Sequence, residues 1–143
     1  MRLSKKTVNE SLQQKSGRSK AIYDWAKEYI LDHIDDWEGQ SVYGSDFAYE
    51  LTEEPNVNGI YEDDSRGFIK DHFDDAGEEY EYQKDNFGAE GVKNPFEDPE
   101  GFVVVWLIDS VGDILTNVPV IEENWNNELE LTPEVIIEIK ESL

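Results

Sequence analysis

The chain has 143 residues, enough for one domain with a buried core, and its net charge of −22 comes from 34 acidic and only 12 basic residues. With 38% hydrophobic residues, including four Trp, seven Tyr and six Phe, it is too apolar for an intrinsically disordered acidic protein. It has no cysteine and no apolar run of about 18 residues, which excludes disulfides, thiolate catalysis and a transmembrane helix.

The charge is unevenly distributed along the chain. Residues 1–20 hold six bases and one acid, whereas residues 21–143 hold 33 acids and six bases. We therefore expect residues 1–18 to form a basic, mobile arm and residues 19–143 to form an acidic globular domain. Such a domain is repelled by nucleic acid and by anionic membranes, so the expected partner is a basic protein surface.

The first long helix is predicted over residues 20–37. Ser19 is a suitable N-cap, and Gly39 is expected to stop the helix. Its apolar residues recur at helical spacing and predict a face toward the core: Ile22, Trp25, Ala26, Tyr29, Ile30, His33, Ile34 and Trp37. A short helix over 47–52, capped by Ser45 or Asp46, and a loop at Pro55 to Gly59 should follow.

The most acidic stretch, residues 62–90, has eleven carboxylates and three cations. Its apolar residues are spaced i, i+3, i+4, i+7 and i+11, which predicts one helix from about Ser65 to residue 83: Ile69, His72, Phe73, Ala76 and Tyr80. Gly67 and Gly77 are the expected weak points of this helix, and a split into two pieces would fall at Gly77. Residues 86–94 are expected to form a loop.

Two further helix starts are predicted, at Asp98-Pro99-Glu100 and at Thr132-Pro133-Glu134. Between them, the valines of residues 102–115 favour a strand but the apolar spacing favours a helix, and we expect a central core helix that ends at Val118-Pro119. Four to five helices predict a mainly α, compact single domain. A small hairpin or sheet from residues 41–44, 57–62 or 118–131 would make it α+β.

A short internal echo contains both histidines. Asp32-His33-Ile34-Asp35-Asp36 recurs as Asp71-His72-Phe73-Asp74-Asp75. In a helix, each His shares a face with the Asp three residues later, so two packed helices could present a tetrahedral zinc site made by His33, Asp36, His72 and Asp75. The alternative is that both histidines fill core space. No cofactor is required, and a structural zinc ion is the one metal that this pattern suggests.

Catalysis is poorly supported by the sequence. It has no Gly-x-Ser-x-Gly, no phosphate-binding glycine loop and no His-Glu-x-x-His. We expect the protein not to be an enzyme.

Dense carboxylates on rigid helices suggest an inhibitor that imitates nucleic acid, because double-stranded DNA carries one charge per roughly 1.7 Å of its axis. Exposed Tyr61, Tyr80, Tyr82 or Trp125 would add hot-spot contacts. The predicted contact residues all lie in the acidic stretch: Asp63, Asp64, Asp71, Asp74, Asp75, Glu78, Glu79 and Glu81. Two alternatives stay open, a small zinc-binding domain and an adaptor for a basic partner unrelated to nucleic acid.

Several turn and cap motifs resemble those of a family of small acidic proteins from phages and prophages of Gram-positive bacteria. They extend over about residues 20–140: Leu51-Thr52-Glu53, Asn56-Val57-Asn58-Gly59, Asp85-Asn86-Phe87, Asn94-Pro95-Phe96, Pro99-Glu100 and Leu131-Thr132-Pro133-Glu134. Proteins similar to these are encoded near anti-CRISPR genes, and some inhibit Cas9.

The resemblance implies a phage-encoded anti-CRISPR protein that acts in the cytoplasm of a host bacterial cell. It implies an inhibitor of a type II effector, binding Cas9 alone or with guide RNA. A restriction enzyme or another DNA-binding protein is the alternative target. We expect no direct nucleic-acid binding by the acidic domain and no membrane association.

Overall fold

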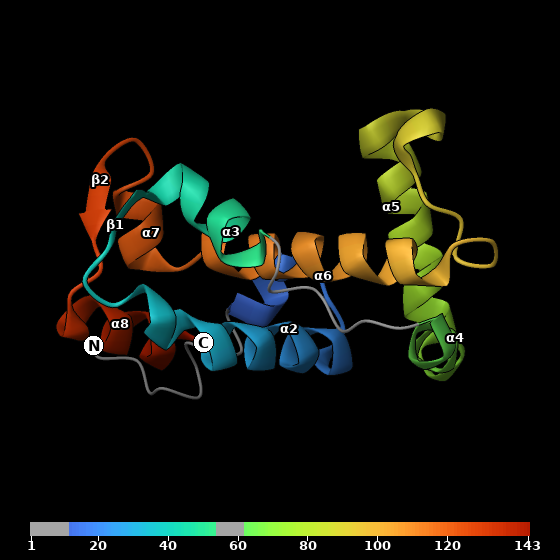
Figure 1. Cartoon of the computed structure of the whole chain (residues 1–143), viewed down its shortest axis with the longest axis horizontal. Helices are drawn as coiled ribbons and strands as arrows, with labels where there is room; N and C mark the ends of the chain where they lie inside the picture. The colour runs from blue at the N-terminus through green and yellow to red at the C-terminus, as the bar shows by residue number, and fades with distance from the viewer. Residues whose placement is uncertain (1–11, 54–61) are drawn as a thin grey trace. The chain divides into compact units, whose positions relative to one another are not determined.

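The computed structural model describes residues 12–53 and 62–143, and these are mainly helical, as predicted (Figure 1). The chain divides into two compact units, Met1–Asn56 with Ile108–Leu143 and Val57–Leu107, and the boundary falls within helix α6 (Pro99–Thr116). Among the described residues, no helix combines the length and apolar character needed to cross a membrane.

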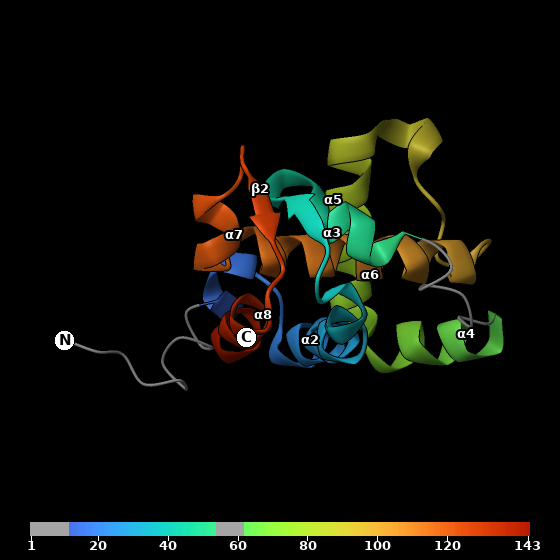
Figure 2. The same ribbon diagram turned by 60° about the vertical axis from the view of Figure 1, so that its left-hand side comes forward.

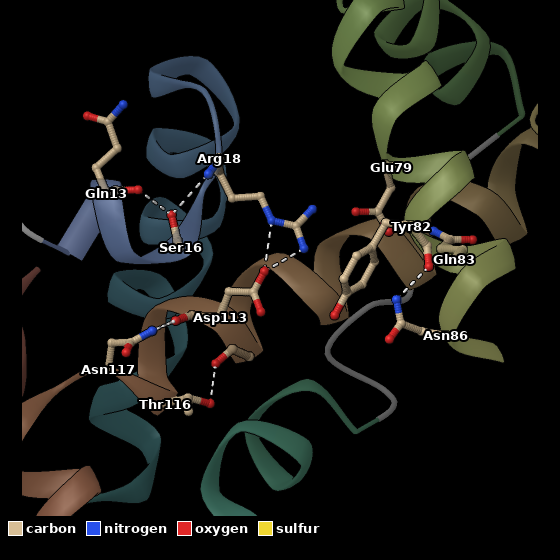
Figure 3. A network of polar contacts seen from close by, with 11 residues as sticks. Gln13, Ser16, Arg18, Glu79, Tyr82, Gln83, Asn86, Asp113, Thr116 and Asn117 are labelled. Carbon is tan, nitrogen blue, oxygen red and sulfur yellow. Dashed lines mark hydrogen bonds and ion pairs between the residues drawn. The ribbon is translucent and has the colours of Figure 1, made fainter.

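The first unit begins with a short helical segment over residues 12–16, in which Leu12 is buried. Arg18 follows, and its Nε and Nη2 atoms both donate to Asp113 Oδ2, at 2.9 and 2.6 Å (Figure 3). These contacts tie residues 12–18 to the first unit. Residues 1–11 lie outside the described residues, so the proposed arm stays a prediction for them.

Helix α2 (Lys20–His33) starts as predicted, since Ser19 Oγ accepts a hydrogen bond from the Ile22 amide. The α-helix ends four residues earlier than predicted, and Ile34–Trp37 forms the 3₁₀ helix η1. Gly39 then turns the chain with a φ of +87°, a conformation that glycine adopts without steric cost.

Strands β1 (Ser41–Tyr43) and β2 (Glu128–Glu130) form an antiparallel pair, which confirms the prediction of a small sheet for two of its three candidate segments. Of the third candidate, residues 57–61 lie outside the described residues. Val42 pairs with Leu129 and both are buried, whereas Tyr43 pairs with Glu128 on the exposed face. Alternation along the strands therefore gives the sheet one core face and one solvent face.

Helix α3 (Gly44–Thr52) packs against β1 and α7 (Pro119–Glu123). Figures 1 and 2 both show α3 and α7 beside the two strands. The helix starts earlier than predicted and has Tyr43 as its N-cap without a side-chain hydrogen bond, so the expected cap at Ser45 or Asp46 is wrong. The backbone does the capping instead: the Gly44 amide donates to Asn124 O at 3.1 Å.

Helix α8 (Pro133–Ser142) starts at its predicted cap, where Thr132 Oγ1 accepts from the Val135 amide at 3.2 Å. Val118-Pro119 separates two helices, since α6 ends at Thr116 and Pro119 opens α7. Proline suits the first turn of a helix because the amide it lacks would have no partner there.

The second unit holds helices α4 (Glu62–Asp71) and α5 (Phe73–Gly91) and the first half of α6. The predicted acidic helix is broken at His72 and not at Gly77. His72 leaves helical geometry with φ −124° and ψ 45°, and Asp74 and Asp75 occupy the first turn of α5, where carboxylates are favoured by the helix dipole. The predicted loop over 86–94 is also wrong for its first part, because α5 continues to Gly91.

Aromatic rings connect the three helices of the second unit. The Trp106 ring lies 5.2 Å from that of Phe68 on α4 and 5.6 Å from that of Phe102, and Tyr80 of α5 meets Phe102 at 6.2 Å. Asp98 Oδ1 accepts from the Gly101 amide at the start of α6, as the cap predicts. The valine-rich segment is therefore a helix, and packing decides against its strand propensity.

Candidate protein-binding surface

A stripe of carboxylates runs along the exposed face of α5. Its members are exposed and spaced i, i+4, i+7 and i+11, which places them on one side of the helix: Asp74, Glu78, Glu81 and Asp85. Eleven residues of helix rise about 16 Å, so the stripe carries one charge per roughly 5 Å. One strand of DNA carries a charge every ~3.4 Å, so the stripe approaches the linear charge density of one strand.

Most of the predicted contact residues are exposed, as the predicted role requires: Asp63, Asp64, Asp71, Asp74, Glu78 and Glu81. Asp75 is partly buried. Glu79 is only 2% exposed and accepts a hydrogen bond from Gln83 Nε2 at 2.7 Å (Figure 3). Including Glu79 was therefore wrong, because it shares the buried side of α5 with Ala76 and Gln83.

One cation modifies the stripe. Lys84 Nζ lies 2.8 Å from Glu81 Oε1 and 4.6 Å from the centroid of the Tyr80 ring. The hydrogen bond to Glu81 raises the pKa of Lys84, so the ammonium stays charged and offsets part of the Glu81 charge. Asp85 also raises the pKa of Lys84 and was missing from the predicted set.

The first unit has an acidic surface that the sequence analysis missed. Residues 28–65 and 94–139 contain no Lys or Arg, and they include β1, α3, α7 and β2. Seven of their carboxylates are exposed on these elements or beside them: Glu38, Asp46, Glu53, Glu122, Glu123, Glu128 and Glu130. The absence of Lys and Arg from these two long segments was the feature of the sequence that indicated this surface.

Large aromatic side chains are exposed on the same elements of the first unit or beside them. Tyr43 is 50% exposed, Tyr49 67% and Trp125 39%. Trp125 was an expected hot-spot residue, and its backbone carbonyl accepts from the Ser45 amide at 3.0 Å, which fixes it beside α3. Tyrosine and tryptophan beside carboxylates suit contact with arginine and lysine, through cation–π as well as charge attraction.

The two histidines occupy equivalent local positions. His33 is the last residue of α2 and stacks on Tyr29, four residues earlier, with ring centroids 4.1 Å apart. His72 lies between α4 and α5 and meets Phe68, also four residues earlier, at 4.7 Å. The echo therefore extends back to Tyr29 and Phe68, and in both copies an aromatic ring contacts the histidine at the end of a helix.

The predicted metal site rests on helical spacing that the structure does not keep at His72. His72 leaves helical geometry between α4 and α5, so Asp75 is not held on the same helical face three residues later. His33 Nδ1 is also 2.8 Å from Tyr29 O. Within residues 12–53 and 62–143, no group of three or more His, Asp or Glu is arranged to hold a metal. The four-ligand set draws on both units and stays a prediction.

Comparison with known proteins does not place the chain in a family. The sequence matches no protein-family model, and no curated protein and no solved structure matches it significantly.

Proposed function

We propose that the protein is a phage-encoded inhibitor that binds the basic nucleic-acid-binding surface of a host defence nuclease, with Cas9 as the expected target. The observation that carries the proposal is the stripe on α5, a row of carboxylates fixed on a regular helix with one charge per roughly 5 Å, against ~3.4 Å along one DNA strand. The resemblance to anti-CRISPR-associated proteins names the target, and the stripe supplies the mechanism.

Binding works by displacement of the natural ligand. A groove built for nucleic acid carries lysine and arginine side chains that are neutralised only when the groove is filled. Carboxylates held on a helix meet these cations without a large loss of conformational entropy, and a net charge of −22 accelerates the encounter. The inhibitor needs no catalytic group and no cofactor for this role.

The acidic surface of the first unit favours a partner with more than one basic patch. Its exposed aromatic residues add contact area that carboxylates lack, so it can hold a partner at higher salt than the stripe alone. A restriction enzyme or another DNA-binding protein offers the same chemistry and is the second candidate target. In either case the protein acts in the cytoplasm of the host cell.

The test is a pull-down of purified protein against Cas9, with and without guide RNA, at about 50 mM and about 300 mM NaCl, a range over which electrostatic contacts weaken strongly. Binding that falls with salt supports the proposal, and the guide-RNA arm shows which form of Cas9 is recognised. Absence of binding at both salt concentrations refutes Cas9 as the target. The same assay is then run against DNA-binding restriction enzymes.

Charge reversal locates the contact. Glu78→Lys with Asp85→Lys reverses two stripe positions in the middle of α5, away from the first turn, where Asp74 also stabilises the helix. Each lost contact should lower the slope of log K against log salt by about one unit and weaken binding about tenfold. The matched control is Glu138→Lys with Glu141→Lys on α8, which changes the net charge equally at exposed positions of the first unit. Equal loss in both variants would mean that only net charge matters.

A further inference from the structure

Two exposed tyrosines of the first unit each lie among carboxylates. On the solvent face of the sheet, Tyr43 is directly opposite Glu128 and diagonal to Glu130. In an antiparallel pair, the Cβ atoms of opposite residues are about 5 Å apart and those of diagonal residues about 7–8 Å apart. Both carboxylates can therefore reach a group that stacks on the Tyr43 ring.

The same combination recurs on α3. Tyr49 lies three residues after Asp46 and four before Glu53, so helical spacing places one carboxylate about a turn away on each side of its ring. All three side chains are exposed, and Tyr49, at 67%, is the most exposed large hydrophobic side chain in the described part of the chain. Because α3 begins directly after β1, the Cα atoms of Tyr43 and Tyr49 lie about 10 Å apart. We call the two tyrosines and their four carboxylates the tyrosine face: Tyr43, Tyr49, Asp46, Glu53, Glu128 and Glu130.

Charge is segregated around the tyrosine face. No lysine or arginine belongs to β1, α3, α7 or β2, the elements that pack together in this part of the first unit (Figures 1 and 2). The cations of the first unit from residue 18 onward contact groups on other elements: Arg18 with Asp113, Lys20 with Asp24, Lys27 with Leu143 O and Lys140 with Asp35. No cation on these four elements offsets the carboxylates of the face, so a positively charged partner complements it.

We propose that the tyrosine face binds an arginine-containing segment of the partner, with one guanidinium stacked on Tyr43 and another on Tyr49. Arginine fits better than lysine because its planar guanidinium stacks on a ring and also donates two parallel hydrogen bonds to a carboxylate, whereas an ammonium is a compact, strongly hydrated charge. Tyrosine and arginine are also among the residues that carry most of the binding energy at protein interfaces. The inference deepens the proposed function, on which it rests for the identity of the partner. Its test uses peptides and no nuclease, so each can fail while the other stands.

A second copy of the chain is a poorer occupant than a separate partner. Each copy carries a net charge of −22, so repulsion opposes the approach of two copies. Two of the three arginines of the chain, Arg18 and Arg66, already donate hydrogen bonds within their own copy. Sedimentation velocity of the free protein at about 0.15 M salt decides this point. Dimers that Tyr49→Leu abolishes would overturn the assignment of the face to a partner.

The basic start of the chain is the other possible occupant, because it holds Arg2, Lys5 and Lys6. Replacing these three residues with glutamine in the full chain tests it. Unchanged amide signals of Tyr43 and Tyr49 in the free protein support a separate partner. If these signals move and the variant binds a basic peptide more tightly at the face, the chain covers its own tyrosine face and the assignment is overturned.

The direct test titrates two blocked hexapeptides, Arg-Gly-Arg-Gly-Arg-Gly and Lys-Gly-Lys-Gly-Lys-Gly, into the ¹⁵N-labelled full chain. The peptides have equal charge, so the net charge of the protein favours neither of them. A cation–π contact at an exposed ring corresponds to about two- to fivefold in affinity. We therefore expect saturable shifts of the Tyr43, Tyr49 and Glu128 amides, with the arginine peptide bound at least about threefold more tightly than the lysine peptide. Equal or tighter binding of the lysine peptide at these amides, or no saturable shift with either peptide, would overturn the proposal.

Two variants and one control complete the test. Tyr43→Ile in the strand and Tyr49→Leu in the helix remove the rings and keep residues suited to each element. Each should weaken binding of the arginine peptide about two- to fivefold and reduce its advantage over the lysine peptide. Phe96→Leu is the matched control, because it removes a ring of similar exposure, 64%, from the second unit and should leave both affinities at the tyrosine face unchanged.

Circular dichroism checks that each variant is folded. An unchanged preference for arginine in both tyrosine variants would show that the rings do not select it and would overturn the proposal. A negative pull-down against Cas9 together with the expected peptide result would refute the target and support the tyrosine face.

Discussion

Replacing Gly44 with alanine tests how closely α3 approaches α7. An added Cβ would lie 2.5 Å from Asn124 O and 2.6 Å from Ile121 O. Favourable contacts between non-bonded heavy atoms need roughly 3.5 Å, so α3 or the end of α7 must move by about 1 Å. Both obstructing atoms are backbone carbonyl oxygens, which cannot rotate away as a flexible side chain would.

The expected cost follows from this geometry. Overpacking typically costs about 1–3 kcal/mol, and Gly44→Ala should fall at the upper end because backbone has to shift. The movement also lengthens the 3.1 Å hydrogen bond from the Gly44 amide to Asn124 O. A loss of about 3 kcal/mol lowers the melting temperature of a domain of this size by roughly 10 °C.

Gly77→Ala is the matched control. Gly77 lies inside α5, and no atom is within 4 Å of an added Cβ. Alanine is the better helix former, so this variant should gain about 0.5–1 kcal/mol. Urea unfolding followed by circular dichroism measures both changes, with tryptophan fluorescence as a second probe of the transition. Wild-type stability of Gly44→Ala would refute the close approach of α3 to α7.

Two further predictions concern the first unit. Burial raises the pKa of Tyr29 to about 12, and burial together with Asp24 raises that of Tyr23 to about 12. Because both values lie above the ordinary value near 10, the free energy of unfolding should be intact below pH 10 and fall as the pH rises toward 12. The urea midpoint should fall less steeply with pH in Tyr29→Phe than in the wild type. Equal slopes would contradict the assignment of this pH dependence to Tyr29. Thr132→Ala removes the cap of α8 and should cost about 1 kcal/mol in thermal unfolding, whereas Thr132→Ser should cost little, and equal losses would show that the hydroxyl is not what matters.

Helix starts could be predicted from the sequence because their causes are local. Ser19, Asp98 and Thr132 each accept an amide from the next turn, as their positions before apolar, periodic segments indicate. The N-cap of α3 was predicted wrongly because its cause is not local. The Gly44 amide donates to the backbone oxygen of Asn124, 80 residues away in the chain. No short-range pattern contains that information.

The candidate site was harder to predict because the number of carboxylates in a helix does not tell which of them face the solvent. Glu79 belongs to the densest acidic run of the chain and is nevertheless buried beside Gln83. The break at His72 had the same effect on the apolar stripe, since it directs Phe73 outward where an unbroken helix would bury it. Whether Glu79 and Phe73 are buried or exposed could be assigned only from the packing of α5.

The acidic surface of the first unit makes ionic strength act in two opposing directions. Dissolved cations gather around unbalanced carboxylates and relieve their mutual repulsion, so the folded state gains stability as salt is added. The same ions compete with the lysines and arginines of a basic partner, so the complex loses affinity. For the proposed basic partner, the fraction of protein that is both folded and bound is therefore greatest at an intermediate salt concentration.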